Sequence, residues 1–351
     1  MSSKFIEIDG SVMEGGGSII RLSSALSVLT HKPIRIFNIR SGRPQPGLRT
    51  QHLRGLEATA EMSGGRVEGA RIGATEVFFY PGTEHSEHIS IGIETAGSVG
   101  LVIQSLLISS MSLKKRLVVD IEGGATFGKY APPLQYIQFV LLPLLRRMGY
   151  HAEINIIRHG FYPVGGSKVK MIVQPPKKLK PVVMKERGDI ESIDIISVAA
   201  MRLKKPRVAE RQYREAENML KKSGYSIEVK SGYSETPCPG SGMVLIAKSA
   251  NGCIIGSDGL GEAGKKAEEV ASDAVNALLG VIRAGSCVDE YMSDQLLPYM
   301  AMAEGRSAIT APVLSSHAQT NMHILEKFLP VKFTVSRTDC GVLIESERWL
   351  S

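Results

Sequence analysis

The most reactive combination of side chains lies near the carboxyl end, in the segment Ser315-Ser316-His317-Ala-Gln-Thr320-Asn321. A strand-like run ends just before this segment, and Ser315 or Ser316 is a typical residue to cap the helix that follows. His317 then lies in the first helical turn, where the helix dipole lowers the pKa of the imidazole and favours its neutral form. A neutral imidazole can attack phosphorus, and Thr320 and Asn321, one turn later on the same face, could orient the ring. In isolation, a histidine that only occupies a capping region is the simpler interpretation.

A second candidate site is the turn Glu14-Gly-Gly-Gly-Ser18, which joins a predicted strand to a predicted helix. Its three glycines allow the backbone to approach a ligand closely, and the N–H groups at the start of the helix attract anions. Glu14 could hold a divalent metal ion beside a bound phosphate. The alternative is a tight turn in which Glu14 only complements the helix dipole.

The charge of the chain is uneven, with a formal net charge of +7 and no acidic residue from position 15 to 56. Besides histidines at 31 and 52, that stretch contains these basic residues: Arg21, Lys32, Arg35, Arg40, Arg43, Arg49 and Arg54. Such a block creates a positive surface that attracts phosphates, and arginine suits bidentate phosphate contacts better than lysine. We therefore expect a nucleic acid, a nucleotide or a phosphorylated metabolite as partner, unless the block is only a solvated basic face.

The helix predicted from Asp289 carries Tyr291, Asp294 and Gln295 on one face. An aromatic ring beside a carboxylate and an amide can stack on a base and hydrogen-bond to it, although an ordinary amphipathic helix is the alternative. The run Gly259-Leu-Gly-Glu-Ala-Gly-Lys-Lys266 is nearly a P-loop, but a lysine stands where Ser or Thr should bind magnesium. We interpret it as a flexible loop before a basic helix.

These residues need a scaffold, and the length of 351 residues predicts two domains or one large domain with an insertion. Apolar periodicity predicts two successive units with the same order of strands and helices. The first unit has strands at 5–9, 33–39, 66–70 and 76–80 and helices at 19–29 and 47–62. The second has strands at 88–93, 116–121, 151–157 and 168–173 and helices at 100–110 and 132–148. A Glu-x-x-Gly turn, beginning at Glu14 and again at Glu94, is expected at the same place in both units.

A third unit fits the carboxyl end, with its opening strand expected at 189–198, helices at 289–303 and 316–328, and strands at 307–311, 331–336 and 341–346. Roughly ninety residues are inserted within it and carry their own pattern: helices at 209–222 and 265–279 and strands at 225–230, 242–247 and 252–256. The predicted fold class is therefore α/β (α+β), with three repeated units around a pseudo-threefold axis and a smaller inserted α/β domain. The predicted boundaries are 1–184 and 284–351 for the three-repeat domain and 185–283 for the insert.

The sequence also predicts a cytoplasmic location. No apolar run approaches the roughly 20 residues that a membrane span needs, and the amino terminus lacks the core of a signal peptide. The four cysteines include no Cys-x-x-Cys pair, so neither a zinc knuckle nor a disulfide framework is indicated.

Together these segments resemble the RNA 3′-terminal phosphate cyclase family over nearly the whole chain. The matching residues are Glu14-Gly-Gly-Gly, Arg40-Ser-Gly-Arg43-Pro-Gln-Pro-Gly-Leu, Gln51-His52-Leu, Ala96-Gly-Ser, Gln104, Ala131-Pro-Pro, Arg158-His-Gly-Phe-Tyr-Pro-Val-Gly-Gly166, Val288-Asp-Glu-Tyr-Met-Ser-Asp-Gln295, His317-x-x-Thr-Asn321 and Phe328-Leu-Pro330. One departure is Ser167, which stands where the family has a third glycine; a positive φ there would be strained. The resemblance implies a fold of three α/β repeats with a small inserted domain.

The resemblance also implies a ligase activity that forms a phosphoric ester bond: ATP-dependent conversion of an RNA 3′-phosphate to a 2′,3′-cyclic phosphodiester, with release of AMP and diphosphate. His317 would be the catalytic nucleophile and carry AMP covalently, and Glu14 would bind Mg²⁺ or Mn²⁺. The implied adenosine pocket comprises Gln104, Pro132, Tyr291, Met292, Ser293, Asp294 and Gln295. The implied site for the RNA phosphate comprises Arg21, Arg40, Arg43, Gln51 and His52, all within the acid-free block.

The main alternative is a cyclase-like protein without catalysis that binds RNA during ribosome assembly. The non-catalytic relatives lack a nucleophile where this chain has His317. An enolpyruvyl-type transferase built on related repeats is a weaker alternative, because it would need neither an adenosine pocket nor a nucleophilic histidine. The physiological RNA, the preferred metal and the purpose of the insert stay open, and a homodimer is expected only because related proteins often pair.

Overall fold

The computed structural model describes residues 5–349, and it begins with a unit of four strands and two helices. Its elements are β1 (Ile6–Asp9), α1 (Gly17–Thr30), β2 (Ile34–Phe37), α2 (Thr50–Ser63), β3 (Arg66–Glu68) and β4 (Val77–Tyr80). The sheet has the order β1-β2-β4-β3, in which only the β1–β2 pair is parallel. Every element of this unit was predicted, with bounds that differ by a few residues.

The second unit repeats this pairing with longer strands. Its elements are β5 (His88–Ser98), α3 (Val99–Ser109), β6 (Leu117–Ala125), α4 (Leu134–Tyr136), α5 (Leu142–Arg147), β7 (Ala152–Arg158) and β8 (Lys168–Val173). The order β5-β6-β8-β7 again has one parallel pair, β5–β6. The single helix predicted at 132–148 is interrupted by a π-helical stretch at Ile137–Leu141. Pro143 has no N–H to donate, which favours such a widened turn just before it.

The predicted turn at Glu94 is wrong. Residues 94–98 continue β5 to Ser98 with a shift of register after Ile93, and α3 begins at once. Ser98 caps α3 by accepting a hydrogen bond from the backbone N–H of Leu101 at 3.3 Å. The irregular end of β5 therefore leads directly into α3, whereas a glycine turn leads into α1.

The third sheet contains the other correction. It has the order β15-β16-β14-β9, with β9 (Val183–Met184) parallel to β14 (Ser307–Ala311). The expected opening strand at 189–198 is instead part of β10 (Ile190–Ala200), which pairs with two strands of the insert. β9 has only two residues, too few to show an alternating pattern. All three sheets thus pair in the same way, while the threefold axis itself stays a prediction.

The rest of the carboxyl-terminal unit was predicted well. Its remaining elements are α8 (Glu290–Gln295), α9 (Leu297–Met302), α10 (Ser316–Phe328), β15 (Val331–Thr338) and β16 (Gly341–Arg348). The helix predicted at 289–303 is broken between α8 and α9, where Pro298 is the second residue of α9. Proline is tolerated in a first turn and not in a helix interior.

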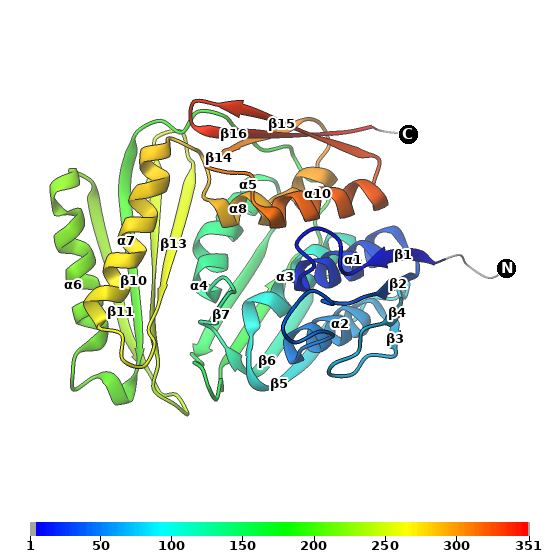
Figure 1. Ribbon diagram of the computed structural model, residues 1–351, viewed down its shortest axis with the longest axis horizontal. Coiled ribbons are helices and arrows are strands. Elements are labelled where there is room, and N and C mark those ends of the chain that lie inside the picture. The colour runs from blue at the N-terminus through cyan, green and yellow to red at the C-terminus, as the bar shows by residue number, and fades with distance from the viewer. Residues whose placement is uncertain (1–4, 350–351) are drawn as a thin grey trace.

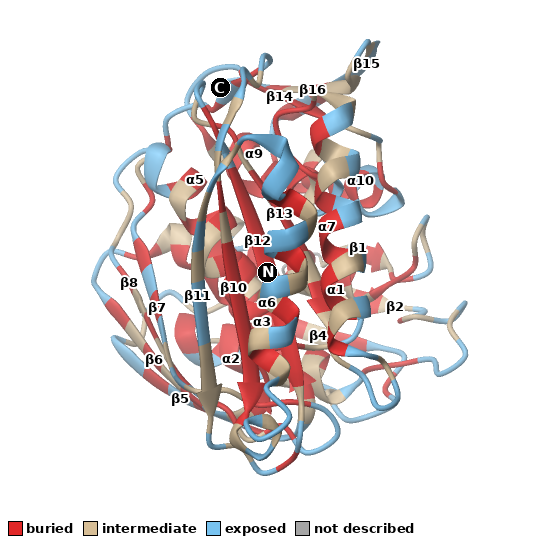
Figure 2. Cartoon of the chain, turned by 90° about the vertical axis from the view of Figure 1, so that its left-hand side faces the viewer, coloured by how far each residue is buried: buried red, intermediate tan, exposed pale blue. Residues whose placement is uncertain are grey.

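The insert forms its own sheet at one side of the molecule, coloured green to yellow in Figure 1. Its elements are β10, α6 (Val208–Leu220), β11 (Ser226–Ser234), β12 (Ser241–Ser249), β13 (Ile254–Leu260) and α7 (Ala267–Ala284), with the strand order β11-β10-β12-β13. One face of β10 and β12 packs under α6 and α7, while Ile196, Val244 and Ile246 on the other face join the main core. Figure 2 accordingly shows β10 and β12 buried and β11 at the edge. The predicted boundaries at 185 and 283 stay a prediction.

Between residues 5 and 349 no helix is long and apolar enough to cross a membrane. The cytoplasmic location and the homodimer stay predictions.

Candidate active site

His317 occupies the position that the sequence predicts. Ser315 caps α10 by accepting a hydrogen bond from the backbone N–H of Ala318 at 3.0 Å, so that His317 is the second residue of the helix. The imidazole is 47% exposed. Partial burial, and then the positive charges of Arg21 and Arg43, hold the pKa of His317 below its ordinary value, which favours the neutral ring at neutral pH.

Glu14 lies beside this imidazole, with 3.6 Å between Glu14 Oε2 and His317 Nδ1. Its side chain is only 9% exposed and forms an ion pair with Arg43, which also donates to the Glu14 backbone carbonyl at 3.0 Å. The backbone N–H of Glu14 donates to Thr320 Oγ1 at 3.3 Å. The glycine turn is therefore fastened to α10, 306 residues away in the chain.

The sequence suggested that Thr320 and Asn321 orient the imidazole. In the structure both side chains bind other groups instead. Thr320 Oγ1 donates to the Ser316 carbonyl at 2.7 Å and accepts from Glu14. Asn321 Nδ2 donates to the Asp294 carbonyl at 3.3 Å, which ties α10 to α8. Spacing along the helix could place these side chains on the correct face but could not show which neighbours they bind.

The glycines after Glu14 leave room for two functional side chains. A Cβ atom at Gly16 would overlap the Glu14 carboxylate, and one at Gly17 would overlap the Nε2 atom of His52. Gly16 precedes the first residue of α1, and no side chain caps this helix. The first N–H groups of α1 therefore have no capping side chain, and they lie beside Glu14 and His52. Uncapped N–H groups at a helix start attract an anion.

The acid-free block divides into two parts. Arg35 pairs with Glu7 and Glu76, and Arg54 pairs with Glu57 and Glu94, so these two guanidinium groups are neutralised at the surface. The other part lies near His317, where Arg21 lines the cavity described below and Arg43 pairs with Glu14. Counting charges within the block could not separate the two parts, because the neutralising carboxylates all lie outside the block.

His52 and Arg40 are held by backbone groups. His52 is buried and its Nδ1 accepts the backbone N–H of Arg49 at 3.1 Å. Burial, followed by the charges of nearby arginines, lowers the pKa of His52 to about 3, so the ring is neutral. Arg40 donates to the carbonyls of Gln45 and Gly47 at 2.8 and 2.9 Å, which shapes the loop that carries Arg43. Gln51, in the first turn of α2, is half-buried.

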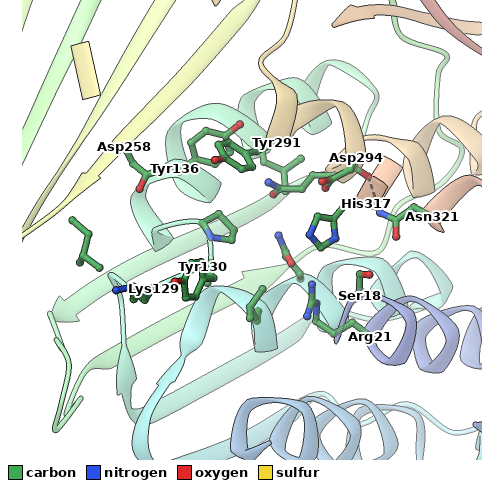
Figure 3. Close-up of a pocket in the computed structure, with 18 of the residues that line it drawn as sticks. Ser18, Arg21, Lys129, Tyr130, Tyr136, Asp258, Tyr291, Asp294, His317 and Asn321 are labelled. Carbon is green, nitrogen blue, oxygen red and sulfur yellow. Dashed lines mark hydrogen bonds between the residues drawn. The ribbon is translucent and has the colours of Figure 1, made fainter. Parts of the chain in front are cut away.

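A cavity of about 550 Å³ opens beside His317 and extends to the insert. Of the predicted pocket residues, five line it: Gln104, Pro132, Tyr291, Asp294 and Gln295. The other two, Met292 and Ser293, are fully buried in α8 and are not part of the wall. Figure 3 shows His317, Arg21 and Asn321 at one end of this cavity and Lys129, Tyr130 and Asp258 at the other.

The cavity wall contains polar groups that need a partner. Gln295 Oε1 and Asn321 Oδ1 are buried and have no hydrogen-bond partner within the described residues. Burial raises the pKa of Asp294 to about 8, although Arg21 opposes the shift, and raises the pKa of Asp258 to about 7. Unpartnered acceptors beside carboxyl groups that retain protons near neutral pH fit a ligand rich in hydrogen-bond donors and acceptors, as a nucleoside is.

Sequence reasoning missed the contribution of the insert. Asp258, Glu262 and Lys265 line the cavity from β13 and from the loop that joins β13 to α7. This loop is the segment that nearly matches a P-loop. Its glycine pattern indicated a loop before a helix, but no local signal indicated that the loop lines the same cavity as His317.

Asp289 was also missed, although it begins the predicted helix. Its buried carboxylate accepts hydrogen bonds from the Tyr136 hydroxyl at 2.6 Å and from the backbone N–H groups of Met292 and Gly256, both at 2.9 Å. It therefore joins α4, α8 and β13 around the cavity. An aspartate that caps a helix is a readable signal, but its two distant partners are not.

The residues that could hold a divalent metal ion are few. In the described part of the chain no three histidine, cysteine or acidic side chains form a cluster. Glu14 is the acidic side chain nearest to His317. One carboxylate beside an uncapped helix terminus suits Mg²⁺ or Mn²⁺ only if the ion takes its other ligands from a bound ligand and water.

Comparison with known proteins agrees with the resemblance read from the motifs. The family model for RNA 3′-terminal phosphate cyclase matches residues 12–335. A Caldivirga maquilingensis protein named RNA 3′-terminal phosphate cyclase is 44% identical over 330 residues, which is 92% of each chain. Proteins of the same name from Pyrobaculum neutrophilum (41% over 345 residues, 97% of this chain and 98% of the relative) and Methanopyrus kandleri (40% over 336 residues, 94% and 95%) are also similar. The chain belongs to the RNA 3′-terminal phosphate cyclase family.

Proposed function

We propose that this protein uses ATP to convert an RNA 3′-phosphate to a 2′,3′-cyclic phosphodiester through a histidine–AMP intermediate. The observation that carries the proposal is the position of His317: a neutral imidazole at a helix start, 3.6 Å from Glu14 and at the edge of a cavity suited to a nucleoside. The family relatives at about 40% identity support the overall reaction.

In the first step His317 attacks the α-phosphorus of ATP. Because Nδ1 faces Glu14, Nε2 is the nitrogen available for attack. The N–P bond forms as the bond between the α-phosphorus and the bridging oxygen breaks, and diphosphate leaves. The negative charge of Glu14 stabilises the positive charge that develops on the ring, while Arg21, which lines the cavity, attracts the phosphates of ATP.

In the second step an oxygen of the RNA 3′-phosphate attacks the phosphorus of the histidine–AMP, and the N–P bond breaks. In the third step the 2′-oxygen attacks the activated 3′-phosphorus, AMP leaves, and the hydroxyl proton passes to solvent. The 2′-hydroxyl is already adjacent to its target, so this step requires alignment more than activation. We assign the RNA phosphate to the side of His317 formed by Arg40, Arg43 and His52, with Gln51 beside them.

The nucleoside of ATP would bind in the cavity between Tyr291, Pro132 and Gln104, with Asp294 and Gln295 as hydrogen-bonding groups. Glu14 is the residue that would hold Mg²⁺ or Mn²⁺. Such an ion supplies positive charge to the phosphate oxygens when it is bound. The ion pair of Glu14 with Arg43 means that binding of the ion would compete with this arginine for the carboxylate.

The test is covalent labelling of the protein with [α-³²P]ATP and a divalent metal. The wild type should acquire an acid-labile, alkali-stable label, as expected for a phosphoramidate. H317A should abolish the label, and H323A, which changes an exposed histidine on the same helix, should retain it. A wild type that acquires no label would favour the non-catalytic RNA-binding alternative, and a labelled H317A would show that a different nucleophile reacts.

A second pair of variants separates the two halves of the reaction. R40A should retain labelling but slow the transfer of AMP to RNA, because Arg40 shapes the loop on the side assigned to the RNA phosphate. R35A, whose guanidinium is neutralised by Glu7 and Glu76, should leave both steps unchanged. An equal loss of labelling and transfer in R40A would contradict this assignment.

A further inference from the structure

Two tyrosines are unusually exposed near the cavity. Tyr130 is 93% exposed and Tyr162 is 76% exposed, the highest values among the exposed large hydrophobic side chains of residues 5–349. Tyr130 lies in the loop that follows β6, and Tyr162 lies in the loop between β7 and β8. Exposed aromatic rings are the side chains on which the bases of single-stranded nucleic acids stack.

The two loops are joined by contacts beneath the tyrosines. The backbone N–H of Thr126 donates to the Gly160 carbonyl at 2.9 Å, and Thr126 Oγ1 lies 2.9 Å from His159 Nδ1. The rings of Phe127 and Phe161 stack with centroids 5.9 Å apart, and both are buried. The exposed rings are therefore carried by a rigid base, so that little conformational entropy would be lost when they bind a partner.

The loop of Tyr162 depends on two adjacent glycines. Gly165 and Gly166 have φ values of +81° and +82°, whereas Ser167 is not among the residues with positive φ. The family departure at Ser167 is therefore unstrained, and its hydroxyl donates to the Gly123 carbonyl at 2.5 Å. Gly165 and Gly166, which precede Ser167, supply the positive φ values that turn the loop.

The loop of Tyr162 and the first turn of α2, which carries Gln51, both pack against the end of β5. A Cβ atom at Gly165 would lie 2.9 Å from the Thr95 carbonyl oxygen, so the loop packs against the end of β5. Two residues later, a Cβ atom at Gly97 would lie 3.6 Å from Gln51 Cβ. The end of β5 therefore lies between Gln51 and the loop of Tyr162 and contacts both.

Lys129 lies beside Tyr130 and is paired with Glu262 of the insert. Lys129 Nζ lies 5.6 Å from the centre of the Tyr130 ring and 3.1 Å from Glu262 Oε1, and its side chain is 58% exposed. An exposed aromatic ring with a cation beside it binds the π-face of a nucleobase and the adjacent phosphate without selecting a base. A protein partner would be expected to require a broader apolar patch than two separate rings.

We propose that Tyr162 and Tyr130 form a stacking platform for the single-stranded RNA that lies 5′ to the reacting terminal nucleotide. The terminal phosphate reaches His317, and the preceding nucleotides follow the path from Gln51 over the end of β5 to Tyr162 and Tyr130. This inference rests on the proposed function for the identity of its ligand. It adds that the enzyme recognises length in its RNA substrate, through stacking that tolerates any sequence.

The test compares two RNAs that end in a 3′-phosphate, a dinucleotide and an octanucleotide. Y162A should raise the KM for the octanucleotide about tenfold, the size expected for the loss of one stacked base. It should leave the KM for the dinucleotide and the labelling from [α-³²P]ATP unchanged. Y162F retains the ring and should behave like the wild type, and W349A, which removes an exposed tryptophan at the end of β16, is the matched control.

Binding of a fluorescent octanucleotide, measured by anisotropy, keeps the two proposals separate. If the wild type cyclises neither RNA, the proposed function fails, whereas a tenfold weaker binding of the octanucleotide by Y162A still supports the platform. Octanucleotide binding that is equal in Y162A and the wild type would overturn the platform and leave the patch to a protein partner. A change that is equal for both RNAs, or a loss of labelling, would also overturn it.

Discussion

Removal of the Asp289 carboxylate should destabilise the protein strongly, because three elements around the cavity depend on it. The side chain is 2% exposed. It accepts hydrogen bonds from the Tyr136 hydroxyl and from the backbone N–H groups of Gly256 and Met292. In D289A all three donors remain buried and lose their acceptor, whereas in Y136F only one hydrogen bond disappears and the carboxylate retains its two backbone donors.

The magnitudes follow from this difference. A hydrogen bond to a charged group contributes about 1.5–3 kcal/mol, which is the expected loss in the free energy of unfolding for Y136F. Each orphaned donor costs about 1–3 kcal/mol, so the three together cost about 3–9 kcal/mol, and part of this cost is offset because D289A no longer buries a carboxylate. D289N retains one acceptor oxygen and should lie between the two variants.

Equilibrium unfolding in urea, followed by circular dichroism, measures these values, and a double-mutant cycle tests their cause. The variant D289A/Y136F lacks the phenolic donor that D289A would orphan. Its loss should therefore fall short of the sum of the single losses by at least about 1 kcal/mol. Additive losses, or a D289A variant that is more stable than Y136F, would refute the reasoning; if D289A does not fold, the same cycle is carried out with D289N.

Three further results are expected from the same geometry. The pKa of His317 lies below its ordinary value of 6.5, so labelling from ATP should reach half of its maximal rate below pH 6.5; a midpoint above 6.5 would contradict the neutral nucleophile. Burial raises the pKa of Asp258 from 3.8 to about 7, so its ionisation opposes folding as the pH rises through this range. Between pH 5 and 8 the unfolding free energy of D258N should therefore rise by at least about 1 kcal/mol relative to that of the wild type. Unfolding free energies of the two proteins that change in parallel with pH would contradict this prediction. In G17A the new methyl group displaces the His52 ring, so transfer of AMP to RNA should slow at least tenfold, whereas G55A, with only Ser105 Oγ at 3.4 Å, should match the wild type in a single-turnover assay.

Features that depend on neighbouring residues could be predicted from the sequence. The cap at Ser315 and the apolar spacing after it located α10 and the position of His317 in its first turn. The glycines after Glu14 predicted a turn with little room for side chains, and at Gly17 the space is taken by the His52 ring, while the approach to a bound anion stays a prediction. In each case the physical cause lies within one turn of helix or one loop, and the residue types express it directly.

Features that depend on distant partners could not be predicted in this way. β9 has two residues and exists only because Val183 and Met184 pair with β14, more than 120 residues later. β10 alternates well enough to open the third unit, and only its pairing with β11 and β12 assigns it to the insert. The contribution of Asp258 to the cavity depends in the same way on how the insert packs against the main core.

The exposure of His317 connects these elements to the proposed chemistry. A nucleophile that carries AMP from ATP to RNA has to meet two substrates in turn at one nitrogen, so it needs two open approaches. The cavity supplies one approach, and the surface near Arg43 and His52 supplies the other; the 47% exposure of the imidazole agrees with a ring that lies between them. Deeper burial of the imidazole would lower the pKa of His317 further but would close one of the two approaches. Full exposure would remove the downward pKa shift that favours the neutral ring. The hydrogen bond from the Glu14 backbone to Thr320 holds the glycine turn against α10. It thereby fixes the turn, which borders the RNA side, next to the helix that carries His317.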